Sequence, residues 1–151
     1  MSDVSRQHAA AIATMIEQAV AGEAAAQGYR VYVGEVTTPE AEIEYPYYVV
    51  WPTPAMRPTN TLAGYDSAAA STIQVTAAGT SPDEVLAALD RAAAGLHRKR
   101  PQITGRNCAL LRQVPGAFPP APTRDDQVHT PDGRPVFFSF ILLQLYSTRR
   151  T

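Results

Sequence analysis

The pattern of apolar positions is most informative close to the C-terminus, in residues 136–146. A β-strand alternates its side chains between two faces, and in this segment both faces are apolar. One face carries Val136, Phe138, Phe140, Leu142, Gln144 and Tyr146, and the other carries Phe137, Ser139, Ile141, Leu143 and Leu145. Such a strand needs cover on both sides. Because a small domain supplies one side from its own helices, we expect a partner subunit on the other side.

A helix is predicted for residues 4–26, with Gly28 as its C-terminal stop. Its apolar side chains recur at the spacing of one helical face. These residues are His8, Ile12, Met15, Ile16, Ala19 and Val20. Since the other positions are largely alanine, we expect this helix to pack against a sheet through a narrow stripe.

A second helix has the clearest start signal in the chain. Ser81 is suited to the N-cap, Pro82 to the first helical position, and Glu84 completes a capping box. The predicted buried stripe is Val85, Leu86, Leu89, Ala93 and Leu96. The basic run at residues 97–100 suits the negative end of the helix dipole, and Pro101 ends the helix.

The remaining periodic segments predict short strands at residues 29–33, 45–51, 68–78 and 103–113. Pro46 implies that the second of these begins after the proline or lies at a sheet edge. In residues 68–78, alternate positions form one apolar face and one face that is wet or interfacial. Clustered prolines make residues 52–64 and 114–135 long loops, which in compact domains are usually functional or ordered by a partner.

This order of elements predicts a single α+β domain. We expect a mixed or mostly antiparallel sheet of about four to five strands, with two helices packed on one face and the other face open. The length of 151 residues fits one domain, and we detect no internal repeat.

Composition narrows the possible classes of protein. A net charge of −1 argues against a protein built mainly to neutralise nucleic acid. The single cysteine, Cys108, cannot form an internal disulfide and is predicted to be an inert core thiol, which fits folding in a reducing cytoplasm. The chain contains no export signal and no apolar run of about 18 residues, so we expect no membrane association.

Nothing in the chain predicts catalysis or a cofactor. Nucleotide-binding glycine motifs and a nucleophile elbow are missing. His8 and His97 are interpreted as packed or capping side chains, and His129 as exposed. Arg124, Asp125 and Asp126 could hold a divalent cation, but their spacing favours an arginine–carboxylate bridge to a neighbouring chain.

Two basic runs and several aromatic residues leave alternatives open. Residues 98–100 could contact DNA phosphates, although helix capping is the simpler interpretation, and Arg149 with Arg150 fits a solvated tail. Trp51, Met56, Tyr65 and Phe118 lie in or beside loops. They fit an interface core as well as packing against the domain itself.

The order of these segments resembles the tail-terminator, or tail-completion, proteins of long-tailed bacteriophages, especially those of actinobacterial phages. The resemblance covers most of the chain after the first helix and rests on the order and spacing of several segments. They are residues 45–52, residues 73–78, the helix entry at 80–84 leading to 89–91, residues 106–108 with 112–113, residues 124–126, and residues 135–138 leading to Ser147. The proline-rich segment 114–122 departs from the family pattern.

The resemblance implies a structural virion protein of the tail or neck, assembled in the host cytoplasm. Such proteins form a ring, of six copies in this expectation, that caps the head-proximal end of the tail tube, ends its polymerisation and joins the head connector. The implied partners are copies of the chain, the tail tube protein and the connector or stopper protein, while DNA only passes through the lumen. The predicted interface residues are Met56, Arg57, Tyr65, Phe118, Arg124, Asp125, Asp126, Arg149 and Arg150.

Three other functions compete with this expectation. A head-closure or connector protein of the same neck is also a small ring former. A small-molecule-binding module or enzyme would use the open sheet face as a pocket with convergent polar groups. A DNA-binding protein would show strongly salt-dependent affinity, against which the near-neutral charge speaks.

Overall fold

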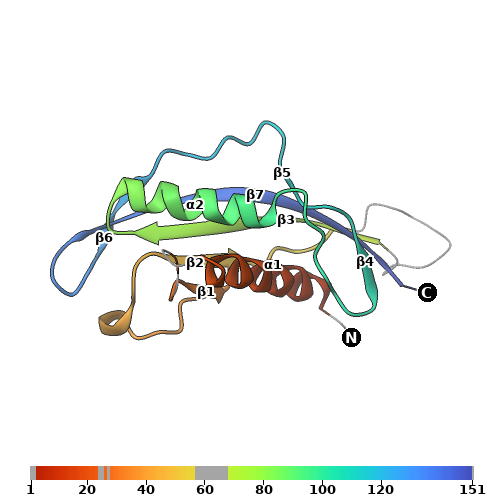
Figure 1. The fold of residues 1–151 in the computed structure, drawn as a ribbon, viewed down its shortest axis with the longest axis horizontal. Helices are drawn as coiled ribbons and strands as arrows, with labels where there is room; N and C mark the ends of the chain where they lie inside the picture. The colour runs from red at the N-terminus through yellow and green to blue at the C-terminus, as the bar shows by residue number, and fades with distance from the viewer. Residues whose placement is uncertain (1–2, 24–25, 27, 57–67, 151) are drawn as a thin grey trace.

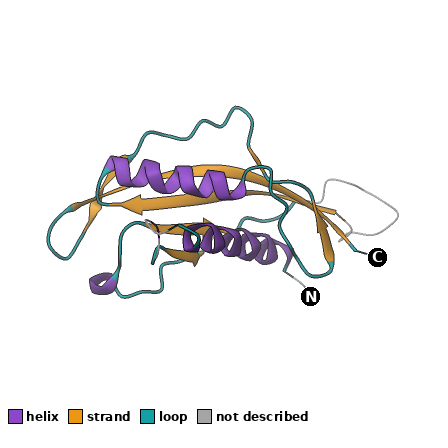
Figure 2. Ribbon diagram, in the orientation of Figure 1, coloured by secondary structure: helices purple, strands orange, loops and turns teal. Residues whose placement is uncertain are grey.

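The computed structural model describes residues 3–23, 26, 28–56 and 68–150 of the chain (Figures 1 and 2). It contains two α-helices and a seven-stranded mixed sheet, which confirms the predicted α+β class. The elements in chain order are α1 (Val4–Ala21), β1 (Arg30–Val33), the short 3-10 helix η2 (Glu40–Glu42), β2 (Tyr47–Trp51), β3 (Ala68–Gly79), α2 (Pro82–Leu96), β4 (Arg106–Cys108), β5 (Arg112–Gln113), β6 (Thr123–His129) and β7 (Pro135–Arg149).

The last strand organises the sheet. The strand order is β1-β2-β3-β7-β4, and β5 and β6 also pair with β7. β1 and β2 are parallel, whereas all the other pairs are antiparallel. β7 runs the length of the molecule, with β6 near one end and β4 near the other (Figure 1).

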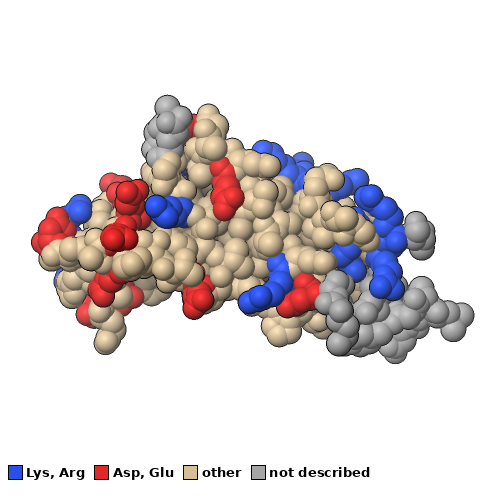
Figure 3. Space-filling view, turned by 90° about the horizontal axis from the view of Figure 1, so that it is seen from below, with Lys and Arg blue, Asp and Glu red and all other residues tan. Residues whose placement is uncertain are grey.

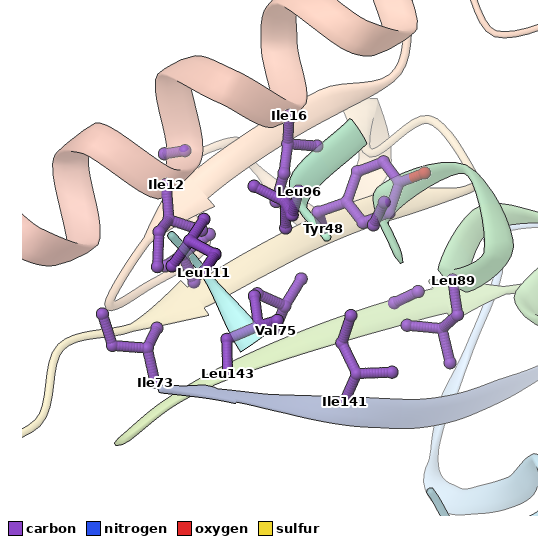
Figure 4. Packing of buried hydrophobic residues seen from close by; sticks show 14 of the residues in the cluster. Ile12, Ile16, Tyr48, Ile73, Val75, Leu89, Leu96, Leu111, Ile141 and Leu143 are labelled. Atoms are coloured by element: carbon purple, nitrogen blue, oxygen red, sulfur yellow. The ribbon is translucent and has the colours of Figure 1, made fainter. Parts of the chain in front are cut away.

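Both helices pack on one face of the sheet, and the hydrophobic core lies between them and the strands (Figure 4). The odd-numbered residues of β7 point into this core, where Ile141 and Leu143 lie opposite Val75 and Ile73 of β3. The fully buried core residues include Ile12 and Ile16 of α1, Leu96 of α2, Tyr48 of β2, and Leu111. The Tyr48 hydroxyl donates to the Ala88 carbonyl of α2 at 2.6 Å, which ties the helix to the sheet.

The helix starts follow the sequence more closely than the helix ends. At α2, the backbone N–H of Glu84 donates to Ser81 Oγ as the predicted capping box requires, whereas the Glu84 side chain accepts from the backbone N–H of Thr80, one residue before the N-cap. At α1, the predicted end at residue 26 is wrong, since the helix ends at Ala21 with Gly22 as its C-cap. The apolar stripe stops at Val20, and alanine propensity without packing does not sustain further turns.

Three further expectations are corrected. Leu86, predicted in the buried stripe of α2, is 47% exposed, and Ala88 occupies that stripe instead. The single strand predicted at residues 103–113 is two short strands, β4 and β5. The predicted loop 114–135 contains β6, an exposed strand that forms a hairpin with β7. The sheet therefore has seven strands, whereas about four to five were predicted.

A polar network is buried between α1 and the sheet. His8 Nδ1 lies 2.7 Å from Ser71 Oγ, and His8 Nε2 lies 2.8 Å from Ser147 Oγ. Arg106 Nε donates to the same Ser147 oxygen at 2.7 Å. All four side chains are buried, which confirms the interpretation of His8 as a packed histidine. Buried polar groups are stabilising only when hydrogen-bonded, so this network fixes how α1, β3, β4 and β7 meet.

The substitution Ser147→Ala is expected to lower the free energy of unfolding by about 2 kcal/mol. It removes an acceptor for a charged guanidinium and a partner of His8 within a buried site. Urea unfolding followed by circular dichroism measures the loss. The matched control is Thr148→Ala, because Thr148 is the next residue along β7 and is only half-buried. Equal losses in the two variants would show that the network contributes nothing specific.

Candidate assembly surface

The sheet face opposite the helices carries a row of large apolar side chains from β7. We call this surface the open face, and its residues are Trp51, Gln74, Thr76, Phe138, Phe140, Leu142, Gln144 and Tyr146. Trp51 and Tyr146 are each 40% exposed and Phe138 is 36% exposed, while Phe140 and Leu142 are half-buried. The even-numbered face of β7 is therefore in contact with solvent over most of its length.

The polar groups in the middle of the open face satisfy one another. Trp51 Nε1 and Gln74 Nε2 each donate to Thr76 Oγ1 at 3.0 Å. Phe140 lies opposite Thr76, and Leu142 lies opposite Gln74. Because these donors point along the sheet, the indole ring, the aliphatic stems and the apolar row of β7 face outward. Exposed contiguous apolar surface of this kind marks interaction sites.

A tyrosine cluster covers one end of this face. The Tyr47 ring contacts Tyr32 edge-on, with a centroid distance of 5.7 Å, and contacts Tyr45 at 5.5 Å. The Tyr32 hydroxyl is hydrogen-bonded to Thr38 Oγ1 at 2.6 Å, which ties the cluster to the loop that carries η2. Burial raises the pKa of Tyr47 to about 12, with smaller contributions from neighbouring Tyr45, Tyr32 and Asp125. This end of the sheet face is thus closed by the chain's own aromatic side chains.

The predicted aromatic and methionine contacts are exposed where the structure describes them. Met56 is 72% exposed. Its backbone pairs with Ala70 of β3, and Ala70 in turn lies opposite Tyr146 of β7. Phe118 is 90% exposed, so it does not fold back on the core. Trp51 combines both expectations, since its ring is partly exposed and its N–H is used within the sheet. Arg57 and Tyr65 lie outside the described residues.

The charged predicted residues fall at opposite ends of β7. Arg124 and Asp126 form a long ion pair of 3.9 Å within β6, and Asp125 Oδ1 accepts from the backbone of Gln127. Arg149 and Arg150 lie at the far end, where β4 pairs with the end of β7. The structure therefore does not gather the seven described residues of this prediction into one patch.

Residues 98–100 and Arg112 form a basic cluster that the sequence analysis did not identify as one site. The run at residues 98–100 follows α2 rather than forming its last turn, so capping does not account for it. The Arg98 N–H donates to the Leu111 carbonyl, and the Leu111 N–H donates to the Lys99 carbonyl, which places the run beside β5 and Arg112. One sequence signal was available: the chain has no aspartate or glutamate between Asp90 and Asp125.

Cavities at the surface add detail to this end of the molecule. A cavity of about 360 Å³ is lined by Arg100, Ala109, Leu110, Arg112, Gln144 and Tyr146. It lies between the basic cluster and the open face, because Arg100 and Arg112 of the cluster line it together with Gln144 and Tyr146 of the open face. Cys108 lies nearby but is buried, and burial raises the pKa of its thiol.

Among the described residues, no group of three or more His, Cys, Asp or Glu side chains is arranged to hold a metal ion. In the same part of the chain, neither helix combines the length and the hydropathy that crossing a bilayer requires.

The chain matches no protein-family model, and no curated protein matches it significantly.

Proposed function

We propose that this protein is a structural component of a bacteriophage neck. In this proposal, copies of the chain form a ring on the head-proximal end of the tail tube, end its polymerisation and present a surface to the head connector. The proposal follows the resemblance of the ordered segments to tail-terminator proteins. The open face is the observation that supports it best.

The open face supports an assembly role for a physical reason. β7 is paired on both sides within the sheet, yet its even-numbered side chains have aromatic and aliphatic surface in water. Covering such surface contributes roughly 25 cal/mol for each Å² removed from water, and aromatic side chains are enriched in interface cores. A neighbouring copy that covers the face through a different surface of its own makes a heterologous contact, which closes into a ring when the rotation permits.

The loops expected to contact the tube or the connector are partly described. Residues 57–66 of the first loop lie outside the described part of the chain. In the second loop, Phe118 points into solvent, while the Pro120 carbonyl accepts a hydrogen bond from Ser139 Oγ at 2.6 Å. Prolines limit the conformations of this segment before docking and so reduce the entropy lost on binding.

A substitution that places a charge on the open face tests the proposal. Phe138→Lys should reduce tube capping at least tenfold, because it forces a charge into the buried contact. Leu86→Lys is the matched control, since Leu86 is a similarly exposed apolar residue on α2, outside the open face. Electron microscopy of tubes built from the tail tube protein of the same phage, with and without each variant, counts the capped ends and measures tube length.

Three results would separate the candidate functions. Rings of the wild-type protein at one tube end, with tube length fixed, support the terminator. Binding to head particles without binding to tubes replaces it with the connector function. Wild-type protein that ignores both rejects the proposal and favours a binding module.

A further inference from the structure

We propose that copies of this chain associate head to tail through two oppositely charged ends, with the basic end of one copy docking on the acidic end of the next. This contact deepens the proposed function and rests on it for its biological role. The two ends are defined by their charged residues, all of which are exposed except Asp125, which is half-buried. The basic end consists of Arg98, Lys99, Arg100, Arg112, Arg149 and Arg150, and the acidic end consists of Glu40, Glu42, Glu44, Asp125, Asp126 and Asp132.

The basic end is a surface of six cationic side chains. All six side chains are exposed, and none has an ion-pair partner among the described residues. Backbone hydrogen bonds hold their positions: residues 98 and 99 bond to Leu111, and the Arg150 N–H donates to the Gly105 carbonyl at 2.8 Å. Like charges held this close repel one another, so an acidic partner surface is favoured.

The acidic end combines η2 with the β6–β7 hairpin. Glu40 and Ala41 line one surface cavity together with Gln127, His129 and Thr130, which shows that the two segments adjoin. Two of the carboxylates are partly neutralised locally, Asp126 by Arg124 and Asp132 by Arg134. Glu40, Glu42, Glu44 and Asp125 have no ion-pair partner in the described part of the chain. Arg30, opposite Tyr47 in the sheet, reduces the net charge of this end without cancelling it.

The two ends cannot neutralise each other within one copy. Asp125 lies opposite Val136 of β7, whereas Arg149 lies near the other end of that strand and Arg112 lies opposite Gln144. At about 3.3 Å per residue, Arg149 is roughly 40 Å and Arg112 roughly 25 Å along β7 from the acidic end, which is at least about three Debye lengths at physiological salt. Acidic residues gather at one side of the space-filling view and basic residues at the other (Figure 3).

A second copy fits both ends better than any other single partner. It carries the two opposite charges in one molecule with a net charge of only −1. A nucleic acid would complement the basic end alone and would be repelled by the acidic end. The cavity of about 360 Å³ between Arg100, Arg112 and Tyr146 also offers room for acidic side chains beside the open face.

Reversing the charge of each end tests this contact. The basic-end variant is Arg98→Glu/Arg100→Glu/Arg112→Glu, and the acidic-end variant is Glu40→Lys/Glu42→Lys/Glu44→Lys. All six residues are exposed, so both variants should fold, which circular dichroism checks. The control Glu17→Lys/Asp90→Lys changes charge on the exposed sides of the two helices. Sedimentation velocity at 50 mM and 500 mM NaCl measures self-association.

The proposal predicts a specific pattern of complementation. Wild type and control should self-associate, with affinity at least tenfold weaker at the higher salt. Each reversed variant alone should associate at least tenfold more weakly than wild type. An equimolar mixture of the two should associate again, because every contact then joins an acidic end to a basic end.

Several results would overturn the charged contact. They are a wild type that stays monomeric at 50 mM NaCl and high concentration, reversed variants that associate like wild type, and a mixture that does not recover. Loss of binding to a DNA duplex in the basic-end variant, with self-association intact, would assign the basic end to nucleic acid instead. Tube capping is scored separately: complementation without capping contradicts the phage function only, and capping by both reversed variants contradicts the charged contact only.

Discussion

Replacing Leu143 by alanine is expected to lower the free energy of unfolding by about 2–5 kcal/mol. Leu143 is fully buried in the core between β7 and the helices, and it lies opposite Ile73 of β3. Truncation removes apolar contacts and leaves a cavity that surrounding strands cannot close, because β7 is paired on both sides. Urea unfolding of the purified variant measures the loss, with the slope of the transition used to check that it remains two-state.

The adjacent residue provides a matched control. Leu142 has the same side chain on the same strand, but it lies on the open face and is only half-buried. We expect Leu142→Ala to cost less than about 1 kcal/mol in the isolated chain, because less apolar area returns to water. In the assembly the order reverses, since Leu142→Ala should weaken association while a folded Leu143→Ala does not. Equal stability losses in the two variants would contradict the assignment of the two faces.

The second large effect is expected at the contact between the helices. A Cβ atom added to Gly95 of α2 would lie only 2.6 Å from the Cβ of Ala19 in α1. Gly95→Val should therefore lower the free energy of unfolding by about 3 kcal/mol, at the upper end of typical overpacking costs. The contacting atom is attached directly to the backbone of α1, so a whole helix has to move. Thermal and urea unfolding both measure this loss.

Two further variants separate helix contact from helix propensity. Ala94→Val introduces the same side chain at the exposed neighbouring position and should cost well under about 1 kcal/mol. Ala19→Gly removes the opposing Cβ, so combining it with Gly95→Ala should recover stability relative to the sum of the single effects. A strictly additive double variant would show that the two helices do not meet at these residues.

The sequence was a good guide where the signal is local or strictly periodic. Ser81 and Glu84 define the start of α2 by hydrogen bonds to the nearest turn, which depend on no other part of the chain. The alternation in β3 places Ile73 and Val75 in the core because each is two residues from the next. The aromatic run after Pro46 likewise became β2, which begins at Tyr47.

The prediction was wrong where a strand depends on its neighbour. β6 has polar or charged residues on both faces, so no apolar alternation marks it, and it exists because β7 offers it an edge to pair with. Residues 103–113 contain enough apolar residues for one strand, and they run antiparallel to β7, but the pairing is interrupted between Cys108 and Arg112 and leaves two short strands. Backbone pairing with a distant strand leaves little trace in side-chain composition.

The charged ends of the candidate site were also not predictable from the sequence, because each is assembled from distant segments. Arg112, Arg149 and the run at 98–100 are far apart in the sequence, and the acidic residues of η2 are far from those of β6. Each group taken alone fits a helix end, a loop or a tail. Their common position becomes visible only when β7 serves as the axis along which both ends are placed.

The sequence by itself determined that residues 136–146 form a strand with two apolar faces, because side-chain alternation is a property of any extended chain. The sequence also determined where α2 begins, because Ser81 and Glu84 are capping residues. Only the tertiary structure decided which face of β7 the helices cover and which face stays open. That choice depends on the packing of α1 and α2 against Leu143 and its neighbours. These segments are distant in the chain, so their packing is settled only when the whole domain folds.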